Sequence, residues 1–492
     1  MAFLDNASPG LRGEAAVALW RLADSSAVDA LIAHDGDPDS GVRWRILYAL
    51  EKTVIPEKIV LRAALRLDDA DPLVRAYAAR TIGLQRHARG LAYLIGALED
   101  PAVPVVVNAL RAVQQIGDSA CAPCGPALLR SLGHPHPYVR VTAATALAER
   151  FAWASFDSAG RRRLEDSLTA RLADPDAATR GAAARALLAR RGEAGLAAVE
   201  PLLADSSVYV RVALLDACRG IARSARVADL LRSRMAPGRP LFERMTAAEV
   251  LGARPAPGAI DLLRSGLADS SALFVSSCAA ALQEAGDTAS VPRIARAFAA
   301  HARDGDADPR ITLRDALRAL AGKSFADSIE RAYPAGDTGA ASYAPDFQLP
   351  PTARGAILRT AKGEIEWAFY GREAPQTVKS FVRLARRGYF DGLAVHRVVP
   401  NFVIQDGDST GTGSGGPGYT IRCEYNPLQY EAGMVGMALS GKDTGGSQWF
   451  ITQSPQPHLN GRYTIFAHVV RGMDVVRQIV QGDRVLEVRI LD

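Results

Sequence analysis

The chain contains a phrase that returns about every thirty-two residues. A short turn rich in Asp, Ser or Pro is followed by Val-Arg or an equivalent and then by a run rich in Ala and Leu, as in DPDSGVRWRILYALEK and HPHPYVRVTAATALAE. The arginines that hold the register are Arg12, Arg43, Arg75, Arg140, Arg180, Arg211, Arg244 and Arg314, with Val106 and Ser276 in the same slot of weaker copies. Most intervals are 31 to 34 residues, and a fixed period of this length indicates a repeat architecture.

Each copy is predicted to form two helices. Asp or Ser at the turn can cap the second helix, whose apolar residues recur at three- and four-residue spacing. Neither helix can bury its apolar stripe alone, so successive pairs must stack into a solenoid. The pattern resembles the HEAT repeat in its short bacterial form, over roughly residues 5 to 330 and about ten units. Armadillo and tetratricopeptide arrays match less well.

The register arginines have two interpretations. In the first, each arginine ties its turn to carbonyls or acids of the neighbouring repeat. In the second, the arginines bind a partner along the concave face. We expect the first, and the sequence does not identify a ligand for the solenoid.

The start of the chain bears on localisation. MAFLDNASPG has no basic segment followed by an apolar one, and no apolar run approaches the ~18 residues that span a bilayer. The chain is therefore expected to be soluble, without a transmembrane segment. The first repeat follows Met1 directly, which leaves no room for its first helix, so we expect upstream sequence that could include a targeting segment. The compartment, cytoplasm or periplasm, is left open.

Charge and cysteine content exclude several classes of function. The net charge is +5 over 492 residues, and the basic residues are scattered, so no nucleic-acid partner is expected. Five cysteines are too few for a disulfide-built scaffold. The pair Cys121 and Cys124 is expected to be a helix start or a disulfide, because a redox motif needs a preceding strand and zinc needs two further ligands. The sequence does not decide whether the two sulfurs bond.

The composition changes after the last repeat. The segment YPAGDTGAASYAPDFQLPPTARG is rich in Pro, Gly and small residues and has no apolar periodicity, which is typical of a linker. The predicted organisation is a HEAT-repeat α-solenoid over 1–331, a linker over 332–354 and a separate domain over 355–492.

The last third has the two-residue period of β-strands. ILRTAKGEIEWAFYG predicts a hairpin with a turn at Lys362-Gly363, and APQTVKSFVRLARRG and GMDVVRQIVQG predict two helices. Short strands are expected in LAVHRVVP, NFVIQDGD, GYTIRCEY, GMVGMALSG, SQWFITQS, YTIFAHVV and VLEVRILD. About eight strands with two helices predict a closed antiparallel eight-stranded β-barrel whose ends are plugged by the helices.

Nucleotide, metal and hydrolytic sites are not indicated in this domain. GTGSGG at 411–416 is followed by Pro417 rather than a helix, and GMALSGKD at 436–443 places Asp443 where a phosphate loop needs Ser or Thr. No GxSxG elbow and no HExxH spacing is present. No cofactor is expected, and His396 is expected to be structural rather than a base.

One arginine stands inside an apolar run. VHRVVPNFVIQDGD, residues 395–408, places Arg397 among β-branched and aromatic residues. A charge in such surroundings is costly unless it has a function or a partner.

Three long motifs then carry a family resemblance. FDGLAVHRVVPNFVIQDGD, GMVGMALSGKDTGGSQWFIT and LNGRYTIFAHVVRGMDVV, in this order, resemble the cyclophilin peptidyl-prolyl isomerases over essentially residues 355–492. The resemblance implies Arg397 as the essential arginine, Phe402 and Phe450 as aromatic walls of a proline pocket, and Gln405 and Gln448 as polar positioning residues. It further implies Val403, Ala438 and Leu459 as the rest of the apolar wall.

Three positions depart from the family's usual residues. Leu439 replaces an Asn whose backbone contacts the peptide, so that contact is expected to survive. His458 replaces a frequent Trp, which bears on cyclosporin binding more than on catalysis. Tyr463 replaces a frequent His and keeps a ring that can hydrogen-bond. All three are predicted to line the substrate site.

The predicted function is catalysis of X-Pro isomerisation during protein folding, a chaperone-like activity. Rotation about this bond crosses a barrier of ~18 to 20 kcal/mol because amide resonance is lost. A guanidinium aimed at the imide nitrogen or the adjoining carbonyl stabilises only the twisted bond. The solenoid would bind a client or another protein. The alternative is a non-catalytic HEAT scaffold whose last domain only binds proline-containing peptides.

Overall fold

The structure is a computed structural model that describes residues 1–23, 25–53, 55–117, 121, 123–149, 156–302, 307–334 and 353–492. Most of the predicted linker therefore lies outside the described residues. The chain divides into two compact units, Met1–Arg191 and Gly192–Asp492. Across the described residues, every helix is too short or too polar to cross a bilayer.

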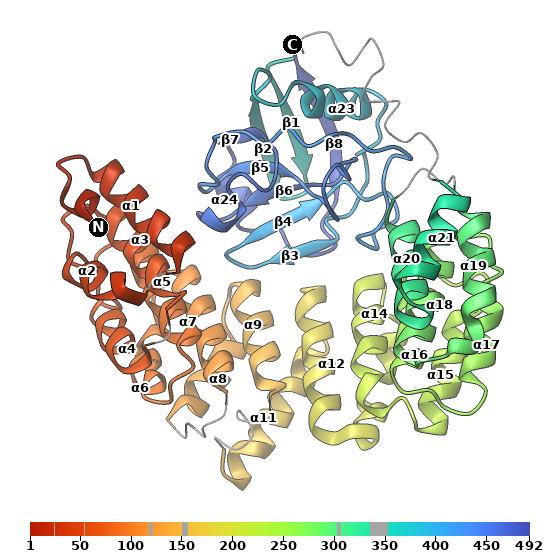
Figure 1. Cartoon of the computed structure of the whole chain (residues 1–492). Helices are drawn as coiled ribbons and strands as arrows, with labels where there is room; N and C mark the ends of the chain where they lie inside the picture. Colours follow the sequence, from red (N-terminus) through yellow and green to blue (C-terminus); the bar gives the residue numbers. More distant parts are fainter. Residues whose placement is uncertain are drawn as a thin grey trace. The chain divides into compact units, whose positions relative to one another are not determined.

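The first unit consists of helix pairs in two layers (Figure 1). Its second helices are α1 (Pro9–Leu22), α3 (Ser40–Leu50), α5 (Pro72–Leu84), α7 (Val103–Ile116), α9 (Pro137–Leu147) and α12 (Ala177–Arg191). Its first helices are α2 (Val28–Ala33), α4 (Pro56–Leu65), α6 (Gly90–Ala97), α8 (Cys124–Leu132) and α11 (Ser158–Arg171). Each second helix packs on the next one, α1 on α3, α3 on α5, and onward to α12. The predicted two-helix stacking is confirmed.

The predicted Asp caps are present at α3 and α5, whereas α1 and α7 have no side-chain cap. The carboxylate of Asp39 accepts a hydrogen bond from the Val42 amide at the start of α3, and that of Asp71 accepts one from the Leu73 amide before α5. At α9 the cap is a histidine, since the His136 ring nitrogen accepts from the Tyr138 amide. These caps satisfy amides that have no partner inside the helix.

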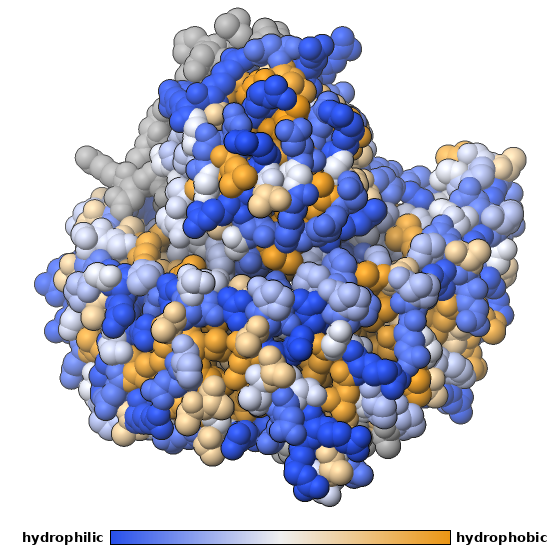
Figure 2. All heavy atoms as spheres, turned by 180° about the vertical axis from the view of Figure 1, so that it is seen from behind, coloured by the Kyte–Doolittle hydropathy of each residue, from blue (hydrophilic) through white to orange (hydrophobic). Residues whose placement is uncertain are grey.

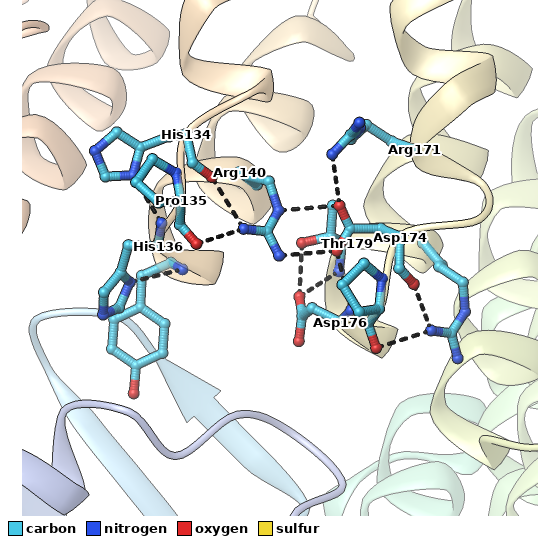
Figure 3. A network of polar contacts seen from close by, with 11 residues as sticks. His134, Pro135, His136, Arg140, Arg171, Asp174, Asp176 and Thr179 are labelled. Carbon is cyan, nitrogen blue, oxygen red and sulfur yellow. Dashed lines mark hydrogen bonds and ion pairs between the residues drawn. The ribbon is translucent and has the colours of Figure 1, made fainter.

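The register arginines join successive turns, and Figure 3 shows one of them. Arg140 donates to both carboxylate oxygens of Asp174 at 2.9 Å, and a third nitrogen donates to the carbonyls of His134 and Pro135 at 2.9 and 2.8 Å. Equivalent ion pairs are Arg12–Asp37, Arg43–Asp69 and Arg75–Asp100. The acids lie in the next repeat, as expected, whereas the carbonyls belong to the arginine's own turn.

A disulfide joins Cys121 to Cys124 at the start of α8. Both sulfur-bearing residues are buried. The pair is thus a disulfide at a helix start.

The second unit continues the helix pairs before its sheet. Its helices are α13 (Leu196–Val199), α14 (Val208–Ala217), α15 (Ala225–Met235), α16 (Leu241–Ala253), α17 (Ala259–Gly266), α18 (Ala272–Glu284), α19 (Val291–Ala300), α20 (Ala307–Ala321) and α21 (Lys323–Ala332). The arginine ladder also continues here, because Arg211 pairs with Glu243 and Arg244 with Asp269. Arg314 differs, since it pairs with its neighbour Asp315.

The remaining residues of this unit form an antiparallel sheet with two helices. The strands are β1 (Gly355–Thr360), β2 (Gly363–Phe369), β3 (Arg397–Val399), β4 (Val403–Asp406), β5 (Met434–Met437), β6 (Trp449–Thr452), β7 (Ile465–Arg471) and β8 (Val485–Leu491). The helices are α23 (Pro375–Ala385) and α24 (Met473–Val476). The predicted hairpin is present, with its turn one residue earlier, because Thr360 pairs with Gly363.

The prediction of a closed barrel is wrong. The strand order is β3-β4-β6-β5-β7-β2-β1-β8, so β3 and β8 are the two edges of an open sheet. The chain just before β3 crosses the gap instead: Gly392 and Val395 donate to the carbonyls of Val485 and Asp483 at 2.7 and 2.8 Å. This contact amounts to one isolated β-bridge between Ala394 and Arg484 and does not form a continuous strand pairing. A strand of three residues is too short to close a barrel by itself.

Two further expectations are corrected. GYTIRCEY is a loop, held by a single bridge between Ile421 and Gly445. The helix predicted in GMDVVRQIVQG ends at Val476. GYTIRCEY alternates like a strand and GMDVVRQIVQG has helical spacing. In both segments the contacts with neighbouring loops, and not the local pattern, determine the backbone conformation.

The core of the sheet lies under α23. Trp367 meets Trp449 edge-on with ring centroids 5.0 Å apart, and Phe381 of α23 packs on Trp367 at 5.2 Å. Each of these three residues is at most 2% exposed. On the face of the molecule in Figure 2, hydrophobic residues lie in patches between hydrophilic ones.

Candidate functional site

A cavity of about 210 Å³ opens on the other side of the sheet from this core. Its lining comes from strands β3, β4 and β6 and from the segments that follow β3, β5 and β6. The lining residues are Arg397, Phe402, Val403, Gln405, Ala438, Leu439, Phe450, Leu459 and Tyr463. Two other predicted site residues lie beside it: Gln448 lines an adjoining cavity that shares Gln405, Ala438 and Leu439, and the His458 ring stacks on Phe402 with centroids 5.7 Å apart.

The register of the sheet brings these side chains together. Arg397 lies directly opposite Gln405, Gln405 opposite Phe450, and Phe450 opposite Gly436. Residues paired across antiparallel strands project from the same face. One row through β3, β4, β6 and β5 therefore carries a cation, an amide, an aromatic ring and a glycine.

Arg397 has a polar partner but no carboxylate partner among the described residues. Its Nη1 donates to Gln405 Oε1 at 3.1 Å, and its guanidinium carbon lies 5.9 Å from the centre of the Phe402 ring. Desolvation lowers the pKa of Arg397 and the nearby Tyr463 raises it, with desolvation the larger effect. The residue is exposed, so the guanidinium can reach a bound molecule.

A chain of amides fixes the position of Gln405. Gln405 Nε2 donates to Gln448 Oε1 at 2.9 Å, and Gln448 Nε2 donates to the carbonyls of Gly413 and Gly415, both at 2.9 Å. The glycine-rich segment 411–416 thus supplies carbonyl acceptors, and no helix follows it in the structure. Because Gln448 Nε2 donates to these carbonyls, Gln448 Oε1 is left to accept from Gln405 Nε2. This fixes the orientation of the Gln405 amide, so its Oε1 faces Arg397.

Aromatic rings form the floor of the cavity. Phe450 stacks on Tyr430 with centroids 5.5 Å apart and meets Tyr463 edge-on at 5.8 Å. Val403, Phe450 and Leu459 are 2%, 5% and 7% exposed. The floor is therefore apolar, while the rim carries Arg397 and Gln405.

Sequence reasoning missed Tyr430 and Gly436. A Cβ atom on Gly436 would lie 2.2 Å from Tyr430 Oη and 2.4 Å from the tip of Phe450, so only glycine lets both rings lie against β5. Tyr430 is 1% exposed, and burial raises its pKa. It belongs to a loop, where no periodicity marks a core residue. For Gly436, a glycine inside a strand was the available signal.

His396 is placed away from the cavity lining. It is buried, neither ring nitrogen has a partner among the described residues, and burial lowers its pKa. A neutral buried ring of this kind agrees with a structural role. A search of the described part of the chain finds no group of three His, Cys, Asp or Glu that could hold a metal ion.

Comparison with known proteins identifies the family of this domain. The family model described as cyclophilin type peptidyl-prolyl cis-trans isomerase/CLD matches residues 356–492. Peptidyl-prolyl cis-trans isomerase B of Bacillus subtilis is 50% identical over 138 residues, which cover 28% of this chain and 96% of that protein. The chain belongs to the cyclophilin family. It is a peptidyl-prolyl cis-trans isomerase with its cyclophilin domain at the C-terminal end.

One more curated protein and one solved structure are also similar to this chain. The peptidyl-prolyl cis-trans isomerase of Synechococcus elongatus is 49% identical over 138 residues, covering 28% of this chain and 95% of that protein. A crystal structure of a cyclophilin type peptidyl-prolyl cis-trans isomerase of Cryptosporidium parvum is 30% identical, with a TM-score of 0.27. The match covers 98% of that chain and 28% of this one. The HEAT-repeat model matches residues 60–124 and 125–219. HEAT repeats are thus present as an additional module before the cyclophilin domain.

Proposed function

We propose that Arg397 is the catalytic group of this isomerase and that the cavity beside it holds the proline ring of a peptide. The observation that carries the proposal is the row Arg397, Gln405 and Phe450, in which a cation borders an apolar floor and has no carboxylate partner in the described part of the chain. We further propose that the chain is organised as a solenoid over 1–331, a linker over 332–354 and a catalytic domain over 355–492.

The proposed mechanism requires neither a nucleophile nor a proton transfer. As the X-Pro bond twists, resonance is lost and the imide nitrogen regains its lone pair. A guanidinium that donates to this nitrogen, or to the adjoining carbonyl, binds the twisted state more tightly than the planar one. Gln405 accepts from the same guanidinium and so holds it over the cavity before the substrate arrives.

The apolar residues would bind the ring rather than react. Val403, Phe450 and Leu459 would form the floor of a slot for proline, with Phe402 and Tyr463 at its sides. Ala438 and Leu439 lie between this cavity and the adjoining one, so they would contact the peptide residue before proline, and Gln448 would keep the glycine-rich segment against it. His458 would support Phe402 by stacking. Proline-containing peptides or unfolded segments are the proposed substrates.

The solenoid is proposed to bind a protein client or partner. The ion pairs of its register arginines are satisfied within the repeats. A partner site should therefore use other side chains of the helices.

A protease-coupled assay on a proline peptide tests the proposal with the full chain. Replacing Arg397 by Ala should lower kcat/KM by about 10² to 10³, the usual loss when a preorganised donor is removed. Arg471→Ala is the matched control, because Arg471 is 76% exposed in its side chain and pairs with Glu366 away from the cavity. Its rate should equal that of the wild type.

The rival reading is a scaffold that binds proline peptides without catalysis. It predicts that the wild type and Arg397→Ala both give the uncatalysed rate while each still binds the peptide. Equal, accelerated rates in the two proteins would instead remove Arg397 from the mechanism and leave the isomerase assignment intact.

A further inference from the structure

The second helices α5 and α7 of the first unit cross with their backbones in close contact. A Cβ atom on Gly83 would lie 2.5 Å from the Cα of Ala112, so the two backbones touch. Arg80 lies one turn before Gly83, and Arg111 lies directly before Ala112. The crossing therefore brings two arginines near each other, and the charge of Arg80 helps to lower the pKa of Arg111.

Arg80 is satisfied within the unit. Its Nε pairs with Glu51 at 3.0 Å, and its guanidinium lies 5.7 and 5.6 Å from the ring centres of Tyr48 and Tyr77. Such contacts with a carboxylate and two rings stabilise a partly buried cation.

Arg111 has no comparable partner. It makes no hydrogen bond, ion pair or ring contact with any residue that the structure describes, and its charged neighbour is Arg80. The side chain is partly buried, and desolvation, followed by the charge of Arg80, lowers the pKa of Arg111 to about 10. A desolvated cation beside a second cation is unfavourable unless an anion joins them.

Two further cations lie over the aromatic rings that extend from Arg80. Lys52 lies over the Trp20 ring at 4.9 Å and Arg45 over the Trp44 ring at 4.4 Å. Trp20 stacks on Tyr48 and Trp44 stacks on Tyr77, which continues the cluster to Arg80. Among the described residues, the nearby carboxylates are both engaged: Glu51 pairs with Arg80, and Glu149 accepts from Gln114, one turn after Arg111.

The fold does not require cations at such a crossing. In the second unit α16 crosses α18 in the same way, since a Cβ atom on Gly252 would lie 2.5 Å from the Cα of Ala281. Here the residue one turn before the glycine is Glu249, whose Oε1 accepts from Ser277 Oγ at 3.0 Å. The same backbone contact therefore carries an acid in one unit and two arginines in the other.

We infer that Arg111, together with Arg80, binds a carboxylate of an acidic segment in a partner protein. The inference rests on the proposed partner-binding role of the solenoid, and it specifies that the bound segment of the partner is acidic. The planar guanidinium matches a carboxylate with two parallel hydrogen bonds. A nucleic acid is disfavoured because Trp44, Tyr48 and Tyr77 are 3%, 1% and 4% exposed and offer no ring on which a base could stack.

The test measures fluorescence anisotropy of a labelled polyglutamate peptide titrated with the full chain at about 50 mM salt, where screening is weak. Arg111→Gln should weaken binding by about tenfold or more, as expected for a charge-assisted hydrogen bond. Arg130→Gln is the matched control: it also removes one positive charge, but from α8, where Arg130 pairs with Glu99 at the surface. Its binding should equal that of the wild type.

Three results would overturn the inference. The wild type would fail to bind the peptide, the two variants would bind it equally well, or single-stranded oligothymidylate would bind more tightly and depend on Arg111. Arg111→Gln relieves a repulsion, so its thermal midpoint should not fall, and a circular dichroism melt checks this. The proline-peptide rate is measured in the same samples, so a loss of binding is distinguished from a failure of the isomerase assignment.

Discussion

Arg140 in the solenoid and Arg397 in the cyclophilin domain are the same residue type in opposite situations. Arg140 is buried, and the four hydrogen bonds described above all end on a carboxylate or a carbonyl of the chain. Arg397 is exposed and donates to a neutral amide, which leaves its charge uncompensated by a described carboxylate. The first arrangement fixes a turn, and the second leaves a charge available to a substrate.

The comparison separates structural from functional arginines by their partners. A carboxylate that neutralises a guanidinium also occupies its donors, so little remains for a ligand. Arg111 resembles Arg397 in this respect, although it belongs to the solenoid. The repeat register identifies Arg140 and its equivalents as structural arginines. It says nothing about Arg111 or Arg397, which lie outside the repeated position.

The largest expected effect separates activity from stability at Arg397. Arg397→Ala should lose about 10² to 10³ of kcat/KM, equivalent to about 2.7 to 4 kcal/mol of transition-state stabilisation. Its free energy of unfolding should change by no more than about 0.5 kcal/mol, as for other exposed positions. Parallel rate and urea-denaturation measurements check both. A large loss of stability would show that Arg397 holds the fold together, contrary to the comparison.

The converse change is Arg140→Ala. Asp174 has a side-chain exposure of 0% and, among the described residues, would keep Arg171 as its remaining cationic partner. Leaving a buried charge poorly paired should cost about 3 kcal/mol. We expect a lower helical melting temperature by circular dichroism and an unchanged rate on a short proline peptide. An unaltered melt would mean that the ladder does not stabilise the turns.

A smaller effect is expected at Gln448. Gln448→Ala removes the hydrogen bonds that orient Gln405 and hold Gly413 and Gly415. A neutral hydrogen bond contributes about 0.5 to 1.5 kcal/mol, so kcat should fall by about threefold to tenfold. The measurement is steady-state kinetics on the same peptide, with Gln448→Glu restoring an acceptor for Gln405. If the alanine variant kept full activity, the amide chain would have no role in positioning Arg397.

The smallest effect is expected at an exposed ion pair. The side chains of Arg130 and Glu99 are 61% and 57% exposed, and such pairs contribute about 0 to 1 kcal/mol. Arg130→Ala should therefore shift the melting temperature far less than Arg140→Ala does. Equal shifts in the two variants would remove burial as the reason for the difference.

Much of the fold could be predicted because its signals are local. Asp39 in a turn caps α3, and the predicted hairpin joins β1 to β2. The helix predicted after the hairpin is α23. Closure of the sheet could not be predicted, because it depends on whether the residues before β3 pair with β8. The segment GYTIRCEY alternates like a strand, but it forms a single β-bridge, between Ile421 and Gly445.

The candidate site was predicted from motifs, and the structure adds the physical connections. Nine of the predicted residues line one cavity, while their catalytic and binding roles stay predictions. Tyr430, Gly436 and the carbonyls of Gly413 and Gly415 were not predicted, because each acts through a neighbour distant in sequence.

By itself the sequence determined the repeat period, the helix starts, the alternation of the strands and the residues of the cyclophilin motifs, all of which are short-range patterns. Only the tertiary structure decided which arginines are neutralised, how the sheet ends, and that Arg80 and Arg111 meet at a glycine crossing. The reason is electrostatic and steric: the state of a charge depends on which groups lie within a few ångströms, and those groups come from distant parts of the chain.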